Sequence, residues 1–216
     1  MAFITYKGKT FEYDEEELDI HTSPEISFAD AQDVLFSTQD ILSKLGITIN
    51  LCFGTLLGAV RDKNFIKGDY DVDVFAKNEY KLISLLWEMK RNGLNLIRVL
   101  PHKVYSFRLA SNPNCYIDIY ILRKTKSIWG LYCYELNGLM IPKKLLKNGE
   151  ISFLGRTFAC PAHPENLLRF WYTDTWKIPI GKFNKKYKYE VSSHYYYIHI
   201  KDFVKRNLRK ILFKLS

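Results

Sequence analysis

Apolar residues recur at helical spacing between Ser27 and Gly46, which predicts the first helix of the chain. Ser27 is suited to cap this helix, because a serine hydroxyl can accept a hydrogen bond from a backbone N–H of the first turn. A β-rich run over 47–53 follows, and Gly54 then leads into a short helical segment. A strand, a glycine turn and a helix in this order form a corner suited to phosphate groups.

The rest of the chain alternates between strand-like and helix-like runs. Residues 71–75 alternate strictly, which predicts a strand with carboxylates on one face and apolar side chains on the other. The runs that follow predict a helix over 78–91, strands over 94–100, 104–109 and 116–122, short strands over 129–160 with turns at 137–138, 148–149 and 155, and a helix over 163–176. Together they predict an α+β fold in which helices flank a mixed β-sheet.

Charge divides the chain into three parts. Residues 1–26 are polar and acidic, and we expect a loosely attached lead-in there. Between 182 and 214 ten Lys or Arg stand against two acidic residues, so this segment holds +8 of the net charge of +9. The sequence therefore predicts a lead-in (1–26), one domain (27–181) and a basic tail (182–216), and the near-neutral domain argues against a broad nucleic-acid-binding face.

Residues 201–216 combine an apolar stripe with basic residues at helical spacing. This pattern fits a helix that lies on an anionic membrane surface, and it fits equally a helix that docks on the domain through its apolar stripe. Both interpretations stay open. The four cysteines form no C-x-x-C pair, and no apolar stretch reaches about 18 residues. We expect a cytoplasmic protein with reduced thiols, peripheral at the inner face of the membrane if the tail binds there.

Asp71 and Asp73 are the first candidates for chemistry. Residues two apart on a strand project from the same face, so these carboxylates can share a divalent cation that neutralises their repulsion. Mg²⁺ prefers a few carboxylates together with phosphate oxygens, and Mn²⁺ suits the same ligands. The alternative is a solvated edge strand whose acidic residues bind nothing.

Asp118 stands alone between apolar residues on a predicted strand, where an unpaired charge is costly to bury. If this strand lies beside 71–75, the three carboxylates converge, and Asp118 is either a further metal ligand or the base that accepts a proton from the attacking hydroxyl. The alternative is an ion pair with an arginine such as Arg108.

Gly54 and Thr55 occupy the predicted strand-to-helix corner, where backbone N–H groups favour an anion. Arg61 and Lys67 are candidates for neutralising further phosphate charge, whereas we expect Lys63 at the surface. The alternative is that the small residues of this segment only permit close packing.

The segment from Gly54 to Arg61, followed by Asn64-Phe65-Ile66 and by Asp69 to Val74, resembles the signature of the LicD and fukutin-related phosphotransferases. That family has a G-T-L-L-G-A-V-R segment, a glycine-phenylalanine pair and a D-D-D-I-D run in a nucleotidyltransferase fold. Asp118 in its I-D-I setting is similar to the family's third carboxylate. The resemblance covers about 27–180. The sequence departs from the pattern at Asn64, at Lys67-Gly68 and at Tyr70, which bears on donor specificity more than on chemistry.

The resemblance implies Mg²⁺-dependent transfer of a phospho-alcohol, such as phosphocholine or a polyol phosphate, from a CDP-linked donor to a sugar hydroxyl of a surface glycan, free or lipid-linked. A quaternary ammonium would need an aromatic pocket, and Asp69, Tyr70, Trp171 and Trp176 are candidate substrate-pocket residues. One alternative is a nucleotidyltransferase that moves a nucleoside monophosphate onto a small molecule, RNA or protein. A non-catalytic binding module is the other.

Overall fold

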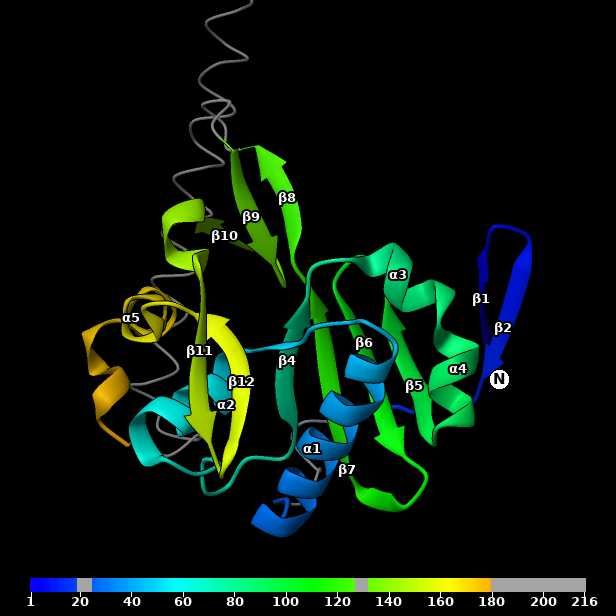
Figure 1. Ribbon diagram of the computed structural model, residues 1–216, viewed down its shortest axis with the longest axis horizontal. Coiled ribbons are helices and arrows are strands. Elements are labelled where there is room, and N and C mark those ends of the chain that lie inside the picture. Colours follow the sequence, from blue (N-terminus) through cyan, green and yellow to red (C-terminus); the bar gives the residue numbers. More distant parts are fainter. Residues whose placement is uncertain (19–24, 127–131, 180–216) are drawn as a thin grey trace, which may run out of the picture.

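The computed structural model describes residues 1–18, 25–126 and 132–179, and a seven-stranded mixed sheet forms its centre (Figure 1). The strand order is β11-β12-β3-β4-β7-β6-β5. The bounds are β3 Asn50–Leu51, β4 Val72–Ala76, β5 Leu94–Leu100, β6 Val104–Leu109, β7 Asn112–Ile121, β11 Asn148–Phe153 and β12 Arg156–Pro161. Helices flank this sheet, which confirms the predicted α+β class.

β4 and β7 lie side by side at the centre of the sheet and run parallel, with Asp73 opposite Asp118. All five residues of β4 are buried, as expected of a strand with neighbours on both edges and side chains packed on both faces. β6 pairs antiparallel with the outer edge of β7, and β5 with β6. The parallel pair brings together residues that are 45 positions apart in the sequence.

α1 (Phe28–Lys44) begins where the sequence predicts, and the hydroxyl of Ser27 accepts a hydrogen bond of 3.0 Å from the backbone N–H of Asp30. The helix packs against β7. The strand predicted over 47–53 is shorter, because α2 (Phe53–Leu57) already begins at Phe53, whose φ of +40° turns the chain out of the extended conformation. A π-helical turn, η1 (Gly58–Asp62), continues α2.

The helix predicted over 78–91 consists of two short helices, α3 (Glu79–Ser84) and α4 (Leu86–Arg91). They are separated at Leu85, whose φ of −112° and ψ of 12° are not helical. The helix predicted over 163–176 also ends early. α5 (Pro164–Tyr172) stops at Thr173, which has a φ of +61°, and a 3₁₀ turn, η3 (Asp174–Lys177), follows.

A small antiparallel sheet lies beside the main one and consists of β8 (Arg123–Lys126), β9 (Tyr132–Leu136) and β10 (Leu139–Pro142). A 3₁₀ turn, η2 (Lys143–Leu146), leads from it to β11. The predicted turns at 137–138 and 155 lie between paired strands. The turn predicted at 148–149 is wrong, because both residues belong to β11 and pair with β12.

The N-terminal residues contain a hairpin that the acidic composition does not predict. β1 (Ala2–Tyr6) and β2 (Lys9–Tyr13) pair antiparallel, and Phe11 and Tyr13 are buried. The Phe11 ring meets Trp87 of α4 edge-on at 5.0 Å, so this part of the predicted lead-in is packed on the domain. The predicted tail, 182–216, including the amphipathic stretch over 201–216, lies outside the described residues.

All four cysteines are buried, and no disulfide joins them, as predicted. No helix of the described residues is long and apolar enough to cross a membrane.

Candidate active site

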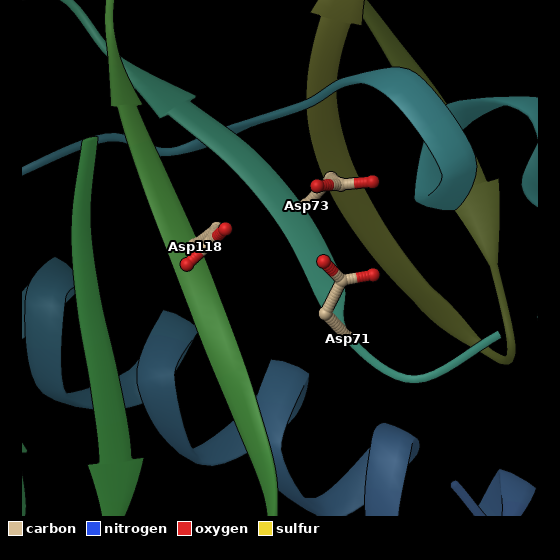
Figure 2. Close-up of side chains that lie close together, drawn as sticks. All are labelled: Asp71, Asp73 and Asp118. Carbon is tan, nitrogen blue, oxygen red and sulfur yellow. The ribbon is translucent and has the colours of Figure 1, made fainter. Parts of the chain in front are cut away.

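Two neighbouring strands bring the three predicted aspartates together. Asp71 precedes β4, Asp73 lies within it, and Asp118 is the cross-strand neighbour of Asp73 on β7. Each of the three offers a carboxylate oxygen within 4.8 Å of those of the other two. Figure 2 shows them on the same face of the sheet, with α1 behind the strands. The two strands do lie side by side, so the predicted convergence of the three carboxylates is confirmed.

The cluster consists of three acidic side chains and contains no basic one. Asp73 is buried, and burial raises the pKa of its carboxyl well above the usual value, with Asp69 and Asp118 raising it further. The backbone N–H of Gly54 donates to Asp73 at 3.0 Å and acts in the opposite direction, as does Tyr120. Closely spaced acidic oxygens that resist ionisation are the ligand set that a hard divalent cation stabilises.

Asp118 is held on both carboxylate oxygens. The hydroxyl of Ser106 donates to Oδ1 at 2.5 Å, and Nη2 of Arg98 lies 3.2 Å from Oδ2. Burial raises the pKa of Asp118, while Ser106 and Arg98 lower it. An arginine thus does pair with Asp118, but it is Arg98. The suggested partner, Arg108, pairs instead with Glu16, 2.6 Å away.

The glycine corner directly borders the cluster. A methyl group on Gly54 would stand 2.7 Å from an oxygen of Asp69 and 3.1 Å from one of Asp73, so only glycine fits. Thr55 is buried, and its hydroxyl accepts the backbone N–H of Asp73 at 2.8 Å. The structure therefore places Gly54 at the carboxylates and uses the Thr55 side chain to join α2 to β4.

Arg61 lies at the end of the π-helical turn with its side chain 13% exposed. Its guanidinium pairs with Asp62 at 2.7 Å and also donates to the backbone carbonyl of Trp176 at 3.4 Å. Lys67 is exposed in the loop before Asp69. Lys63 is exposed as well, as expected, and has a left-handed φ of +56°.

A cavity of about 330 Å³ opens beside the cluster. It combines acidic, basic and aromatic side chains. Its lining is Phe53, Gly54, Leu57, Arg61, Ile66, Lys67, Gly68, Asp69, Tyr70, Asp71, Asp73, Tyr120, Asn137, Tyr172, Thr175, Trp176 and Ile178. Most of the predicted site residues thus share one cavity, whereas Thr55, Asp118 and Trp171 do not line it.

Aromatic rings form part of the cavity wall. The Phe53 ring packs edge-on against Tyr120 at 4.9 Å and in a tilted arrangement against Trp171 at 4.6 Å, so Trp171 packs behind a ring of the wall. Trp176 is buried, lines the cavity, and its indole N–H has no hydrogen-bond partner among the described residues. Burial, and then the charge of Asp71, raises the pKa of Tyr70, which therefore stays neutral at physiological pH.

Several residues of the site carry no signal that sequence reasoning recognised. Tyr120 lies two positions after Asp118, so the strand alternation could have placed it on the same face. Phe53 adjoins the predicted glycine corner. Arg98 and Ser106 belong to strands that read as ordinary β-rich runs, and only their cross-strand pairing brings them to Asp118.

The sequence matches a protein-family model over residues 46–163, more than half of the chain. The model describes the nucleotidyltransferase domain of LicD, FKTN and FKRP. The chain belongs to this family. The membership confirms the resemblance seen in the sequence and supports a transferase activity. The matched range contains the glycine corner and all three aspartates of the cluster.

Solved structures with a related arrangement are more distant. A lincosamide antibiotic adenylyltransferase, LnuA, with lincomycin bound is 11% identical and covers 79% of this chain and 97% of its own, with a TM-score of 0.47. The antibiotic-resistance factor ANT(2'')-Ia in solution is 9% identical and covers 88% and 96%, with a TM-score of 0.47. The same factor in complex with adenylyl-2''-tobramycin is 10% identical and covers 83% and 96%, with a TM-score of 0.43. No curated protein is significantly similar in sequence.

Proposed function

We propose that this LicD-family protein transfers a phospho-alcohol, of the phosphocholine or polyol phosphate type, from a CDP-linked donor to a sugar hydroxyl of a cell-surface glycan. One observation carries the proposal. Three carboxylates offer oxygens within 4.8 Å of one another, and two of them line a cavity that Gly54 and two basic side chains also line. Donor diphosphate and divalent cation both have suitable partners there.

The residues present fit Mg²⁺ or Mn²⁺. The cluster offers only hard oxygen donors, and burial together with nearby like charges raises the pKa of Asp73, a cost that a bound cation would offset. Asp71 and Asp73 line the cavity and would hold the ion toward the donor. The ion would supply charge stabilisation on the diphosphate oxygens as the bond to the departing CMP breaks.

Asp118 fits the metal-ligand role better than the base role in this proposal. It offers an oxygen within 4.8 Å of those of Asp71 and Asp73, and it does not line the cavity into which an acceptor hydroxyl would enter. Phosphoryl transfer through a loose transition state depends on positioning and charge more than on a strong base. Asp118 would then ligate the ion from the side of the sheet.

The remaining cavity residues have separate tasks. Arg61 and Lys67 would bind phosphate oxygens of the donor, because both line the cavity and both have basic side chains. Tyr70 and Trp176 would pack against the alcohol, where aromatic faces suit a quaternary ammonium and Asp69 adds negative charge. The acceptor glycan would enter from the open side of the cavity.

A second candidate is transfer of a nucleoside monophosphate, because the matched family model describes a nucleotidyltransferase domain. The same metal site serves both reactions, and the products differ. Transfer of the phospho-alcohol releases CMP, whereas nucleotidyl transfer from a nucleoside triphosphate releases pyrophosphate and labels the acceptor with nucleotide.

The test is to incubate the protein and Asp73→Asn with Mg²⁺, a panel of CDP-alcohols and nucleoside triphosphates, and candidate saccharides, and to quantify CMP and pyrophosphate. We expect CMP release that depends on one CDP-alcohol, on Mg²⁺ and on Asp73. Nucleotide incorporation with pyrophosphate release and no CMP would establish the second candidate. Equal turnover by Asp73→Asn would contradict both.

A further inference from the structure

We infer that Arg98 is a positioning residue that fixes Asp118 in the geometry a divalent cation requires, although it does not line the cavity. The inference rests on the proposed function, because it assumes that the carboxylate cluster holds a cation. No motif identifies Arg98, and its role comes entirely from how four strands align.

A single polar row crosses the centre of the sheet. Arg98 on β5 is opposite Ser106 on β6, and Ser106 is opposite Asp118 on β7. Asp118 in turn is opposite Asp73 on β4. Residues in register on neighbouring strands project from the same face. The row therefore runs from the guanidinium group of Arg98 at the edge of the sheet to the carboxylates at its centre.

A β-bulge puts Arg98 into this row. Leu96 pairs with Phe107, and the next pair is Arg98 with Ser106, so Ile97 is the extra residue of β5. An unbulged strand would place the apolar Ile97 opposite Ser106 and turn Arg98 to the other face. The bulge is also tied to the chain's N-terminal segment, because the backbone carbonyl of Ile97 accepts the N–H of Glu16 at 2.8 Å.

The contacts form a closed triangle. Nε of Arg98 donates to the Ser106 hydroxyl at 3.1 Å, and Nη2 donates to Oδ2 of Asp118 at 3.2 Å. The same hydroxyl donates to Oδ1 of Asp118. The planar guanidinium therefore holds the serine and the carboxylate at once, and a lysine could not reproduce this fork. Fixed outer partners of this kind orient metal-binding carboxylates.

Arg98 acts on the cation site only through Asp118. It is not among the residues that line the cavity, and its side chain is 23% exposed. Arg156 on β12 offers a matched control away from the row. It too pairs with a carboxylate, that of Asp40, and its other hydrogen bond goes to the backbone carbonyl of Phe36.

The test is Mn²⁺ binding to the full chain, followed by electron paramagnetic resonance, for wild type, Arg98→Ala and Arg156→Ala. We expect Arg98→Ala to weaken Mn²⁺ binding by about 10- to 100-fold, and Arg156→Ala to leave it within about 3-fold of wild type. Millimolar guanidinium should restore binding to Arg98→Ala and leave Arg156→Ala unchanged. Circular dichroism and thermal melting verify that each variant is folded.

Arg98→Lys provides the same comparison with a smaller disturbance, because it keeps the charge and loses the fork. We expect it to bind Mn²⁺ between wild type and Arg98→Ala. Wild-type affinity in both Arg98 variants would overturn the inference while leaving the proposed function intact. Failure of the wild-type protein to bind Mn²⁺ would overturn the cation site, and the proposed function and this inference with it.

Discussion

Asp73 and Glu79 are two buried acidic residues of the same domain with opposite surroundings. Glu79, at the start of α3, accepts the backbone N–H of His102 at 2.9 Å and the Tyr105 hydroxyl at 2.8 Å, and its other oxygen meets the His102 ring at 2.8 Å. Burial raises the pKa of Asp73, Asp69 and Asp118 raise it further, and the Gly54 N–H and Tyr120 oppose the shift. Hydrogen-bond donors thus compensate the buried carboxylate of Glu79, whereas neighbouring carboxylates add a repulsion at Asp73 that a bound cation would remove.

The largest expected effect is a loss of transfer activity on replacing Asp73, which replacing Glu79 should not cause. Asp73→Asn keeps the shape of the side chain and removes the charge that holds the ion. Because a metal contributes several kcal/mol to stabilisation of the transition state, we expect transfer to fall by about 10³-fold or more. The measurement is the initial rate of CMP release at saturating Mg²⁺.

Glu79→Gln is the control for this experiment, since it also replaces a buried carboxylate with an amide. We expect its transfer rate to stay within about 3-fold of wild type. Similar losses in the two variants would show that burial of an acid, rather than membership of the cluster, accounts for the effect.

The second prediction concerns the close approach at the glycine corner. In Gly54→Ala the added methyl would stand 2.7 Å from Asp69 and 3.1 Å from Asp73, so one carboxylate has to move. A displacement of this size at catalytic groups costs about 10²-fold, and we expect that loss in the transfer rate. Gly155→Ala is the control, because its Cβ would meet nothing within 4 Å and only its φ of +81° is strained. A variant Gly54→Ala as active as Gly155→Ala would rule out the close approach as a functional constraint.

The third prediction is that replacing Glu79 lowers the free energy of unfolding, whereas replacing Asp73 raises it. Glu79→Ala leaves the Tyr105 hydroxyl and the His102 N–H without their acceptor, and we expect a loss of about 1–3 kcal/mol in the free energy of unfolding. Asp73→Asn should instead stabilise the metal-free protein, because it removes one of several repelling charges. Urea denaturation of both variants checks the two signs, and destabilisation by Asp73→Asn without metal would contradict the account.

The smallest expected effect is the pH dependence of that difference. The pKa of Asp73 is raised above 3.8 in the folded protein, so the folded state binds the proton more tightly than the unfolded chain does. The stability contribution of Asp73 is therefore fully present below pH 3.8 and is lost as the pH rises through the folded pKa.

Thermal melting of the metal-free proteins measures this dependence. The advantage of Asp73→Asn over wild type should grow from about pH 4 to neutral pH and reach roughly 2–4 °C for each kcal/mol of repulsion. Mg²⁺ should reduce the advantage by binding to folded wild type. A difference that does not change with pH would contradict the raised pKa.

The spacing of Asp71 and Asp73 predicts their shared face, because a strand repeats every two residues. The position of Asp118 depends on parallel pairing of β4 with β7 across a long sequence separation, which local pattern cannot supply. The β-bulge that turns Arg98 toward Asp118 is harder to predict, because no residue type in this β-rich run marks a one-residue register shift. The Phe53 conformation that shortens the predicted strand is set by tertiary packing against Tyr120 and Trp171.

The most direct test of the cation site is a crystal structure of the protein soaked with Mn²⁺ and a CDP-alcohol, with anomalous data at the manganese edge. The account predicts a manganese peak bonded to oxygens of Asp71, Asp73 and Asp118, at about 2.0–2.2 Å as is usual for small hard cations, with the donor diphosphate on its cavity side. A protein in which the donor binds and the three carboxylates hold no manganese would contradict it.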